Sequence, residues 1–188
     1  TIFPGQDLQF LNDDNFLLSF KRGSSDQMIF FDSYKIDYNK EFHSGLAFNI
    51  IAENKKQVPL GRLKFVTNNL GQTEVSSINT DAVDVNLRFA PNEQFYQGKN
   101  FRIPIPNKYP IFKLNYRQGL KNVVNGEYQF SRVAGQIFKR FYLAQLGFTD
   151  MELEGGKILG SVPYPLLNLP QANQSFFLQE TSFNMMNF

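Results

Sequence analysis

Alternation of apolar and polar residues is the dominant pattern along this chain. In residues 31–42 the apolar side chains fall on one face of an extended backbone and the polar ones on the other. His43, Ser44 and Gly45 follow as a turn, and residues 46–54 repeat the alternation. The pattern predicts a β-hairpin. Its apolar face consists of Tyr34, Ile36, Tyr38, Phe42, Leu46, Phe48, Ile50 and Ala52, with Ile51 breaking the alternation.

The same alternation recurs in residues 81–90 and 111–119, and more weakly in residues 60–68, 94–105, 127–143 and 146–160. Helical periodicity is scarce, because Gly, Pro and Asn interrupt the chain at short intervals. The spacing of the turn signals predicts an all-β fold, an antiparallel meander of roughly eight to ten strands. No linker divides the chain, so residues 1–188 are expected to form one domain.

Composition changes this picture by suggesting which solvent meets each face. Only 19% of the residues are charged, against roughly 25% in an average soluble protein, and the chain carries 19 Asn and 14 Gln. The polar positions of the strands therefore resemble a hydrated lumen. Aromatic residues near strand ends could anchor the strands at lipid headgroups: Tyr34, Phe42, Tyr116, Tyr128, Phe141, Tyr142 and Phe148. Both features favour strands of a transmembrane β-barrel.

Charge and cysteine content exclude several classes of function. The formal charge is only +2, which does not favour a nucleic-acid partner. The absence of cysteine rules out disulfides, thiolate metal sites and cysteine nucleophiles within the chain. His43 is the only histidine and is expected in a turn, so no histidine-based triad or metal site is predicted. Lys55, Lys56 and Arg62 are interpreted as a small basic loop.

The C-terminal third carries a longer and more specific pattern. Its segments are residues 156–167 (GKILGSVPYPLL), 173–177 (NQSFF) and 183–187 (FNMMN), preceded by residues 108–110 and 116–119. They resemble the barrel portion of an uncharacterised outer-membrane family common in Bacteroidetes. In that family a carboxypeptidase-regulatory-like domain precedes a barrel related to the surface-antigen (BamA/TamA-like) superfamily. The resemblance runs from about Leu87 to the end, with Ala172 and Met185 departing from the usual Gly and Leu. It implies that the chain is part of a larger barrel.

The candidate chemistry centres on three carboxylates at alternate positions, Asp150, Glu152 and Glu154. On a strand they point the same way, about 7 Å apart, and need basic partners. The preceding strand offers Arg132, Lys139 and Arg140, with Lys139 opposite Asp150 for a two-residue loop and Arg140 opposite it for a three-residue loop. A catalytic carboxylate pair is one interpretation. An acidic lumen stripe balanced by basic residues is favoured, because acid/base pairs normally sit on different strands.

A proline-rich segment forms the second candidate site. Prolines at 163, 165 and 170 exclude a central strand, so a long ordered loop is predicted. It would pack on the barrel rim, or act in the lumen or against a partner. Its proposed structural residues are Pro163, Tyr164, Pro165, Leu166, Leu167 and Asn173.

These observations lead to one interpretation and two alternatives. The chain is expected to be a non-enzymatic segment of an outer-membrane β-barrel, without cofactor or metal, that contacts outer-membrane lipid and possible envelope proteins. By resemblance, its parent would act in outer-membrane assembly, translocation or surface display. The first alternative is a soluble all-β module that binds carbohydrate or another small ligand. The second is a glycoside hydrolase that uses the region of Asp150, Glu152 and Glu154.

Overall fold

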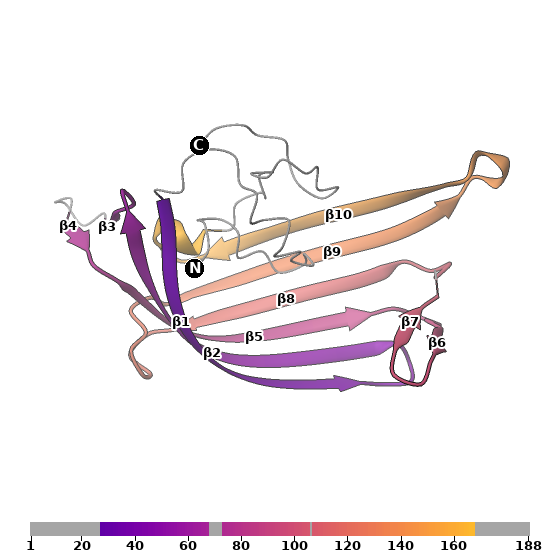
Figure 1. The fold of residues 1–188 in the computed structure, drawn as a ribbon, viewed down its shortest axis with the longest axis horizontal. Helices are drawn as coiled ribbons and strands as arrows, with labels where there is room; N and C mark the ends of the chain where they lie inside the picture. The colour runs from indigo at the N-terminus through magenta and orange to yellow at the C-terminus, as the bar shows by residue number, and fades with distance from the viewer. Residues whose placement is uncertain (1–26, 68–72, 106, 168–188) are drawn as a thin grey trace. The chain divides into compact units, whose positions relative to one another are not determined.

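The structure is a computed structural model that describes residues 27–67, 73–105 and 107–167 (Figure 1). It contains ten strands and two short 3-10 helices within these ranges. The strands are β1 (Gln27–Glu41), β2 (Leu46–Gly61), β3 (Phe65–Thr67), β4 (Thr73–Val75), β5 (Ile78–Phe89), β6 (Phe95–Gln97), β7 (Arg102–Pro104), β8 (Ile111–Leu120), β9 (Phe130–Tyr142) and β10 (Phe148–Leu159). The helices are η1 (Ala144–Leu146) and η2 (Tyr164–Leu166). The prediction of an all-β fold is confirmed.

The six long strands form one sheet in the order β1-β2-β5-β8-β9-β10. The register is antiparallel for β5 with β8, β8 with β9 and β9 with β10. Each long strand lies beside the next long strand of the chain, as a meander requires (Figure 1). Within the described residues the sheet is open, with β1 and β10 as its edges.

The four short strands depart from the predicted meander. β3 pairs with β4 and β6 pairs with β7, each as a separate two-stranded hairpin inserted between long strands. Each of these strands is only three residues long, shorter than a usual strand of five to six residues.

The chain divides into two compact units. The second unit, Tyr34–Asn54 and Thr80–Ser161, contains β6 to β10, most of β5, the end of β1 and the start of β2. Its first turn follows β1, as predicted. Gly45 there has φ +80°, and a Cβ atom at this position would lie 2.1 Å from the carbonyl oxygen of Ala90. The Ala90 amide donates to the Gly45 carbonyl at 2.8 Å, which ties the turn to the end of β5.

The described part of the first unit comprises residues 27–33, 55–67, 73–79 and 162–167. It corrects the expected basic loop, because Lys55 and Lys56 lie within β2. Lys55 is buried and its Nζ lies 5.1 Å from the centroid of the Phe31 ring. The alternation that ends at Asn54 in the sequence is continued by Lys55 and Gln57, whose side chains are both buried.

Candidate functional site: the polar face of the sheet

The six-stranded sheet has one apolar and one polar face, and the polar one is the more buried. On β5 Asp84 is buried and Asn86 half-buried, whereas Leu87 and Phe89 on the other face are exposed. On β8 the same contrast separates buried Asn115 from its exposed neighbours. The face that carries Leu87 is called the apolar face below, and the face that carries Asp84 the polar face.

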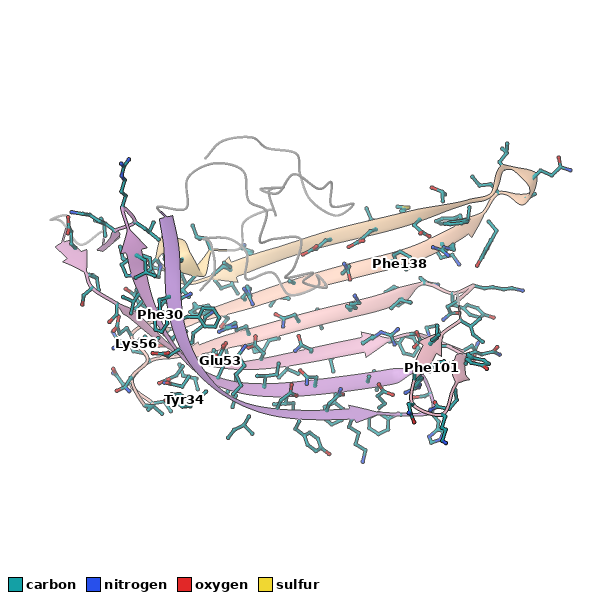
Figure 2. The ribbon with its side chains drawn as sticks, viewed as in Figure 1. Phe30, Tyr34, Glu53, Lys56, Phe101 and Phe138 are labelled. Carbon is teal, nitrogen blue, oxygen red and sulfur yellow. The ribbon has the colours of Figure 1, made fainter. Side chains whose placement is uncertain are left out.

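The apolar side chains of the alternating strands are expected to form one outer, lipid-facing band, and they lie on the apolar face. None of its members is buried. Tyr34, Ile36, Tyr38, Leu46, Ile50, Leu87, Phe112, Leu114 and Tyr116 are exposed, and Phe48, Val83 and Val85 are half-buried. Figure 2 shows side chains along both sides of the ribbon. Among the described residues nine polar and seven hydrophobic side chains are buried, so the usual distribution is inverted.

A ladder of amides crosses four strands on the polar face. Asn115 on β8 donates from Nδ2 to Oδ1 of Asn86 on β5 at 2.6 Å, and Asn86 donates to Oδ1 of Asn49 on β2 at 3.0 Å. Asn49 in turn donates to the carboxylate of Asp37 on β1. The sequence places these residues at polar strand positions, but the ladder depends on the register between strands, which the sequence does not determine.

A cluster of charges lies next to this ladder on the same four strands. Arg117 on β8 contacts Glu53 on β2 at 2.8 Å and Asp84 on β5 at 3.3 Å. Lys35 on β1 reaches the second oxygen of Glu53 at 3.2 Å. Both carboxylate side chains are less than a tenth exposed. The cations therefore balance charges that would be costly to bury alone.

The acidic stripe of β10 lies on the polar face, and its residues are exposed. Asp150 pairs with Arg140 through two hydrogen bonds, from Nε at 2.6 Å and Nη2 at 2.7 Å. Glu152 accepts from the amide of Gln136. Glu154 stands opposite Gln136 in the register.

The register decides between the two expected basic partners. Residues 143–147 separate β9 from β10, and this five-residue connection places Arg140, not Lys139, opposite Asp150. Lys139 stands on the apolar face opposite Met151 and donates to the carbonyl of Lys108. Arg132 is buried on the polar face opposite Arg117 and Ile158.

The expected proline-rich loop is described only at its start. Pro163 accepts from the Leu166 amide at 2.9 Å, which forms the 3-10 turn of Tyr164, Pro165 and Leu166. Leu167 is exposed. Asn173 and the rest of the loop lie outside the described residues.

Aromatic rings collect on the apolar face at the end of the sheet where β1, β5 and β9 end. Phe42, Phe89, Phe112 and Phe141 are each 41–44% exposed, and the rings of Phe89 and Phe112 stack with centroids 6.5 Å apart.

Two of the aromatic residues expected to anchor the strands at lipid headgroups lie instead on the polar face. Tyr142 and Phe148 are cross-strand partners on the polar face, where the Arg140 guanidinium lies 4.0 Å from the Phe148 ring. The alternation places them there, two residues from Arg140 and Asp150 respectively.

At the opposite end of the sheet, beyond the apolar stretch of β5, Asp81 holds the β8–β9 connection. Its Oδ2 accepts the backbone amides of Val124, Asn125 and Gly126 at 2.7–2.9 Å. Burial alone would raise the pKa of Asp81. Hydrogen bonds from Asn54 and from the three amides outweigh burial and hold the pKa below its ordinary value.

Within residues 27–67, 73–105 and 107–167 no group of three or more His, Cys, Asp or Glu residues is placed to hold a metal ion. No helix in the described ranges is long and apolar enough to cross a membrane.

These features define an antiparallel all-β domain with a networked polar face and an exposed apolar face. Residues 28–188 match the C-terminal domain of a family of unknown function, DUF5686, and the chain belongs to that family. No curated protein and no solved structure matches the chain.

Proposed function

We propose that the six-stranded sheet is part of the wall of an outer-membrane β-barrel, with the apolar face toward lipid and the polar face toward the lumen. The observation that carries this proposal is the inverted distribution of side chains. Leu87, Leu114, Val133, Ile137 and Leu153 on four successive strands are all exposed. On the polar face of β5, β8 and β9, by contrast, Asp84, Asn115, Arg132 and Gln136 are buried.

The energetics of burial support this assignment. Exposing a large aliphatic or aromatic side chain to water instead of burying it forgoes roughly 1.5–3 kcal/mol. A contiguous exposed face of such residues indicates a partner surface or a membrane. Alternation with apolar residues outward and polar residues inward is the arrangement of transmembrane barrel strands. A barrel must close to leave no strand edge in lipid, so the strands that complete this sheet would come from the rest of the protein.

The role of the whole protein follows from the same proposal. A barrel wall with a charge-balanced polar face suits a non-enzymatic role in outer-membrane assembly, translocation or surface display. The acidic stripe of Asp150, Glu152 and Glu154 would then line the hydrated lumen beside Arg140.

Cysteine labelling of two adjacent residues tests the orientation of the sheet. Leu114 and Lys113 are neighbours on β8 with side chains on opposite faces. The full-length protein, with any cysteine outside this chain replaced by serine, would carry either Leu114→Cys or Lys113→Cys in phospholipid vesicles. We expect a water-soluble maleimide to label position 113, and a lipid-soluble one to label position 114.

Labelling of position 114 by the water-soluble maleimide and of position 113 by the lipid-soluble one would reject the proposal. Leu114 is 44% exposed, so in a soluble module a cysteine at this position would react rapidly with the water-soluble reagent. Labelling of both variants in denaturant provides the control for reactivity.

A further inference from the structure

The connection between β5 and β8 carries the β6–β7 hairpin at one end of the sheet. It is described at residues 90–105 and 107–110. Figure 1 shows the hairpin beside the ends of β1 and β5. Long ordered connections of this kind usually serve a function.

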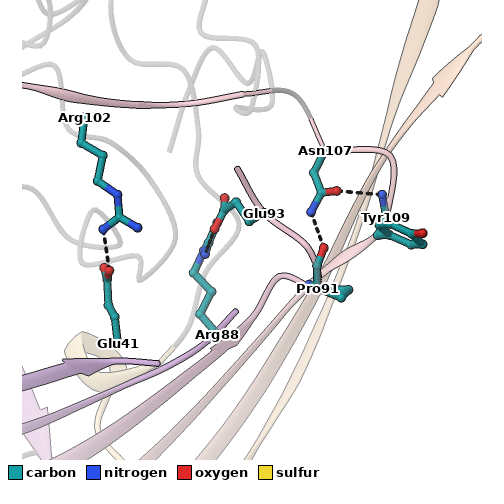
Figure 3. Close-up of polar contacts among 7 residues, drawn as sticks. All are labelled: Glu41, Arg88, Pro91, Glu93, Arg102, Asn107 and Tyr109. Carbon is teal, nitrogen blue, oxygen red and sulfur yellow. Dashed lines mark hydrogen bonds and ion pairs between the residues drawn. The ribbon is translucent and has the colours of Figure 1, made fainter. Parts of the chain in front are cut away.

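Two ion pairs tie the connection to the sheet, and both end on the polar face (Figure 3). Arg88 on β5 pairs with Glu93, and Arg102 on β7 pairs with Glu41 on β1. The alternation of β5 and β1 places Arg88 and Glu41 on the polar face. Because β2 lies between β1 and β5, the hairpin crosses two strand spacings, about 10 Å, on that side of the sheet.

The base of the hairpin is firmly held. Arg88 donates two 2.6 Å hydrogen bonds to Glu93, whose side chain is 5% exposed. Asn107 donates to the Pro91 carbonyl at 2.9 Å and accepts from the Tyr109 amide at 3.1 Å, which joins the outgoing and returning parts of the connection. A bidentate pair with a buried carboxylate is strong and only weakly screened by salt, so the base should stay in place.

The hairpin itself is stiff. Three residue pairs join β6 to β7, and the Ile105 amide extends the pairing by donating to the Gln94 carbonyl at 2.8 Å. At the turn the Gly98 amide donates to the Phe101 carbonyl at 2.9 Å. The Phe101 ring stacks on Tyr96 with centroids 6.1 Å apart. These contacts let the hairpin move as one body about its base.

The far side of the hairpin is held by an exposed ion pair. Arg102 contacts Glu41 at 2.7 Å, and the two side chains are 44% and 57% exposed. The Arg102 guanidinium also lies 3.5 Å from the centroid of the Phe95 ring, which keeps it extended along the hairpin. Exposed ion pairs contribute little to stability and are screened by salt. This contact can therefore open while the base stays closed.

We propose that the β6–β7 hairpin is a salt-sensitive lid on the mouth of the lumen, hinged by Arg88 and Glu93 and latched to β1 by Arg102 and Glu41. This inference rests on the proposed function, because it takes the polar face as the wall of the lumen. With the latch closed, the hairpin spans the polar side of the strand ends and narrows the mouth. With the latch open, the hairpin swings away from β1 and passage through the lumen increases.

The distance between two nitroxides tests the latch in the full-length protein, with any cysteine outside this chain replaced by serine. Labels at Lys99→Cys, between β6 and β7, and at His43→Cys, in the turn after β1, report how far the tip lies from β1. We expect Glu41→Gln, or a rise in KCl, to increase the population at long distance roughly two- to fivefold. Exchanging the charges, with Glu41→Arg and Arg102→Glu together, should largely restore the short distance. Glu74→Gln is the matched control, because it removes the acid of another exposed ion pair.

Conductance in a planar bilayer tests whether the hairpin limits passage. At one KCl concentration we expect Glu41→Gln to raise the conductance of the full-length protein, and the charge exchange to return it toward the parent value. A conductance that stays constant while the distance lengthens would show that the hairpin does not limit passage, which overturns the lid.

The labelling of Leu114→Cys separates this inference from the proposed function. If only the lipid-soluble maleimide reaches position 114, and neither Glu41→Gln nor salt changes the distance, the barrel assignment stands and the lid is wrong. If the water-soluble maleimide labels position 114, the barrel assignment is wrong, and the lid falls with it whatever the distance does.

Discussion

Arg117 on β8 reaches across β5 to Glu53 on β2, with Nη2 2.8 Å from Oε2, although β2 and β8 are not neighbours in the sheet. Its Nη1 lies 3.3 Å from Asp84 on the strand between them. One guanidinium therefore joins three strands. Both carboxylates are buried, so loss of Arg117 would leave Asp84 without its nearest cation and Glu53 with Lys35 alone.

We expect Arg117→Met to lower the free energy of unfolding by about 3–5 kcal/mol, because Glu53 and Asp84 would be left buried without their shared cation. Urea titration of the full-length protein in detergent would measure the change. Lys64→Met provides the control, since the Lys64–Glu74 pair is more than 60% exposed and should contribute at most about 1 kcal/mol. Equal effects of the two substitutions would contradict a stabilising role for the Arg117 cluster.

The amide ladder gives a second stability prediction. Asn86 accepts from Asn115 and donates to Asn49, so Asn86→Ala removes two hydrogen bonds of the ladder. A cost of roughly 1–3 kcal/mol is expected. The same urea titration measures it, with Asn125→Ala in the exposed connection as a control expected to stay within about 0.5 kcal/mol. If Asn86→Ala left the free energy of unfolding unchanged, water would replace the hydrogen bonds of the ladder at no cost in stability.

The long strands were predictable because alternation is local. The sequence predicts the β1–β2 hairpin and the cores of β5 and β8, since apolar residues at every second position need no knowledge of distant neighbours. The continuation of β2 through Lys55 could not be predicted in this way. Two adjacent lysines favour a solvated loop unless the burial of Lys55 beside the Phe31 ring is known.

The contacts of the candidate site were harder to predict from the sequence, because they depend on the register between strands. Asp150, Glu152 and Glu154 could be placed on one face, but the partner of Asp150 changes from Lys139 to Arg140 with a one-residue difference in pairing. The pairing of Arg117 with Glu53 involves residues 64 positions apart and two strand registers. Nothing local in the sequence distinguishes these two residues from other charged ones.

The hydrogen bonds of Asp81 predict that the stability of the protein depends on pH. Its folded pKa is below the ordinary 3.8, so the ionised carboxylate contributes stability that is fully present above that pH and lost as the pH falls through the folded value. We therefore expect Asp81→Asn to destabilise the β8–β9 connection at pH 7 and to reduce the loss of stability below pH 3.8. Hydrogen exchange of the Val124, Asn125 and Gly126 amides, followed from pH 7 downward, measures both effects.

A variant whose amides exchange as slowly as in the parent at pH 7 would contradict this prediction. Asp32→Asn is the matched control, because Asp32 is an exposed residue of β1 and lies outside this connection.

The last prediction concerns the acidic stripe and follows from the lumen assignment. Asp150, Glu152 and Glu154 are exposed on the polar face, so their charges act mainly on the surrounding solution and contribute little to packing. Replacing all three by Asn, Gln and Gln should leave the protein folded and shift its permeability toward anions, because Arg140 would keep its charge without Asp150. The reversal potential in a planar bilayer under a KCl gradient measures the shift. Lys157→Gln on the opposite face of β10 should leave it unchanged. A triple variant that loses a hydrolytic activity of the parent would instead assign these carboxylates to catalysis.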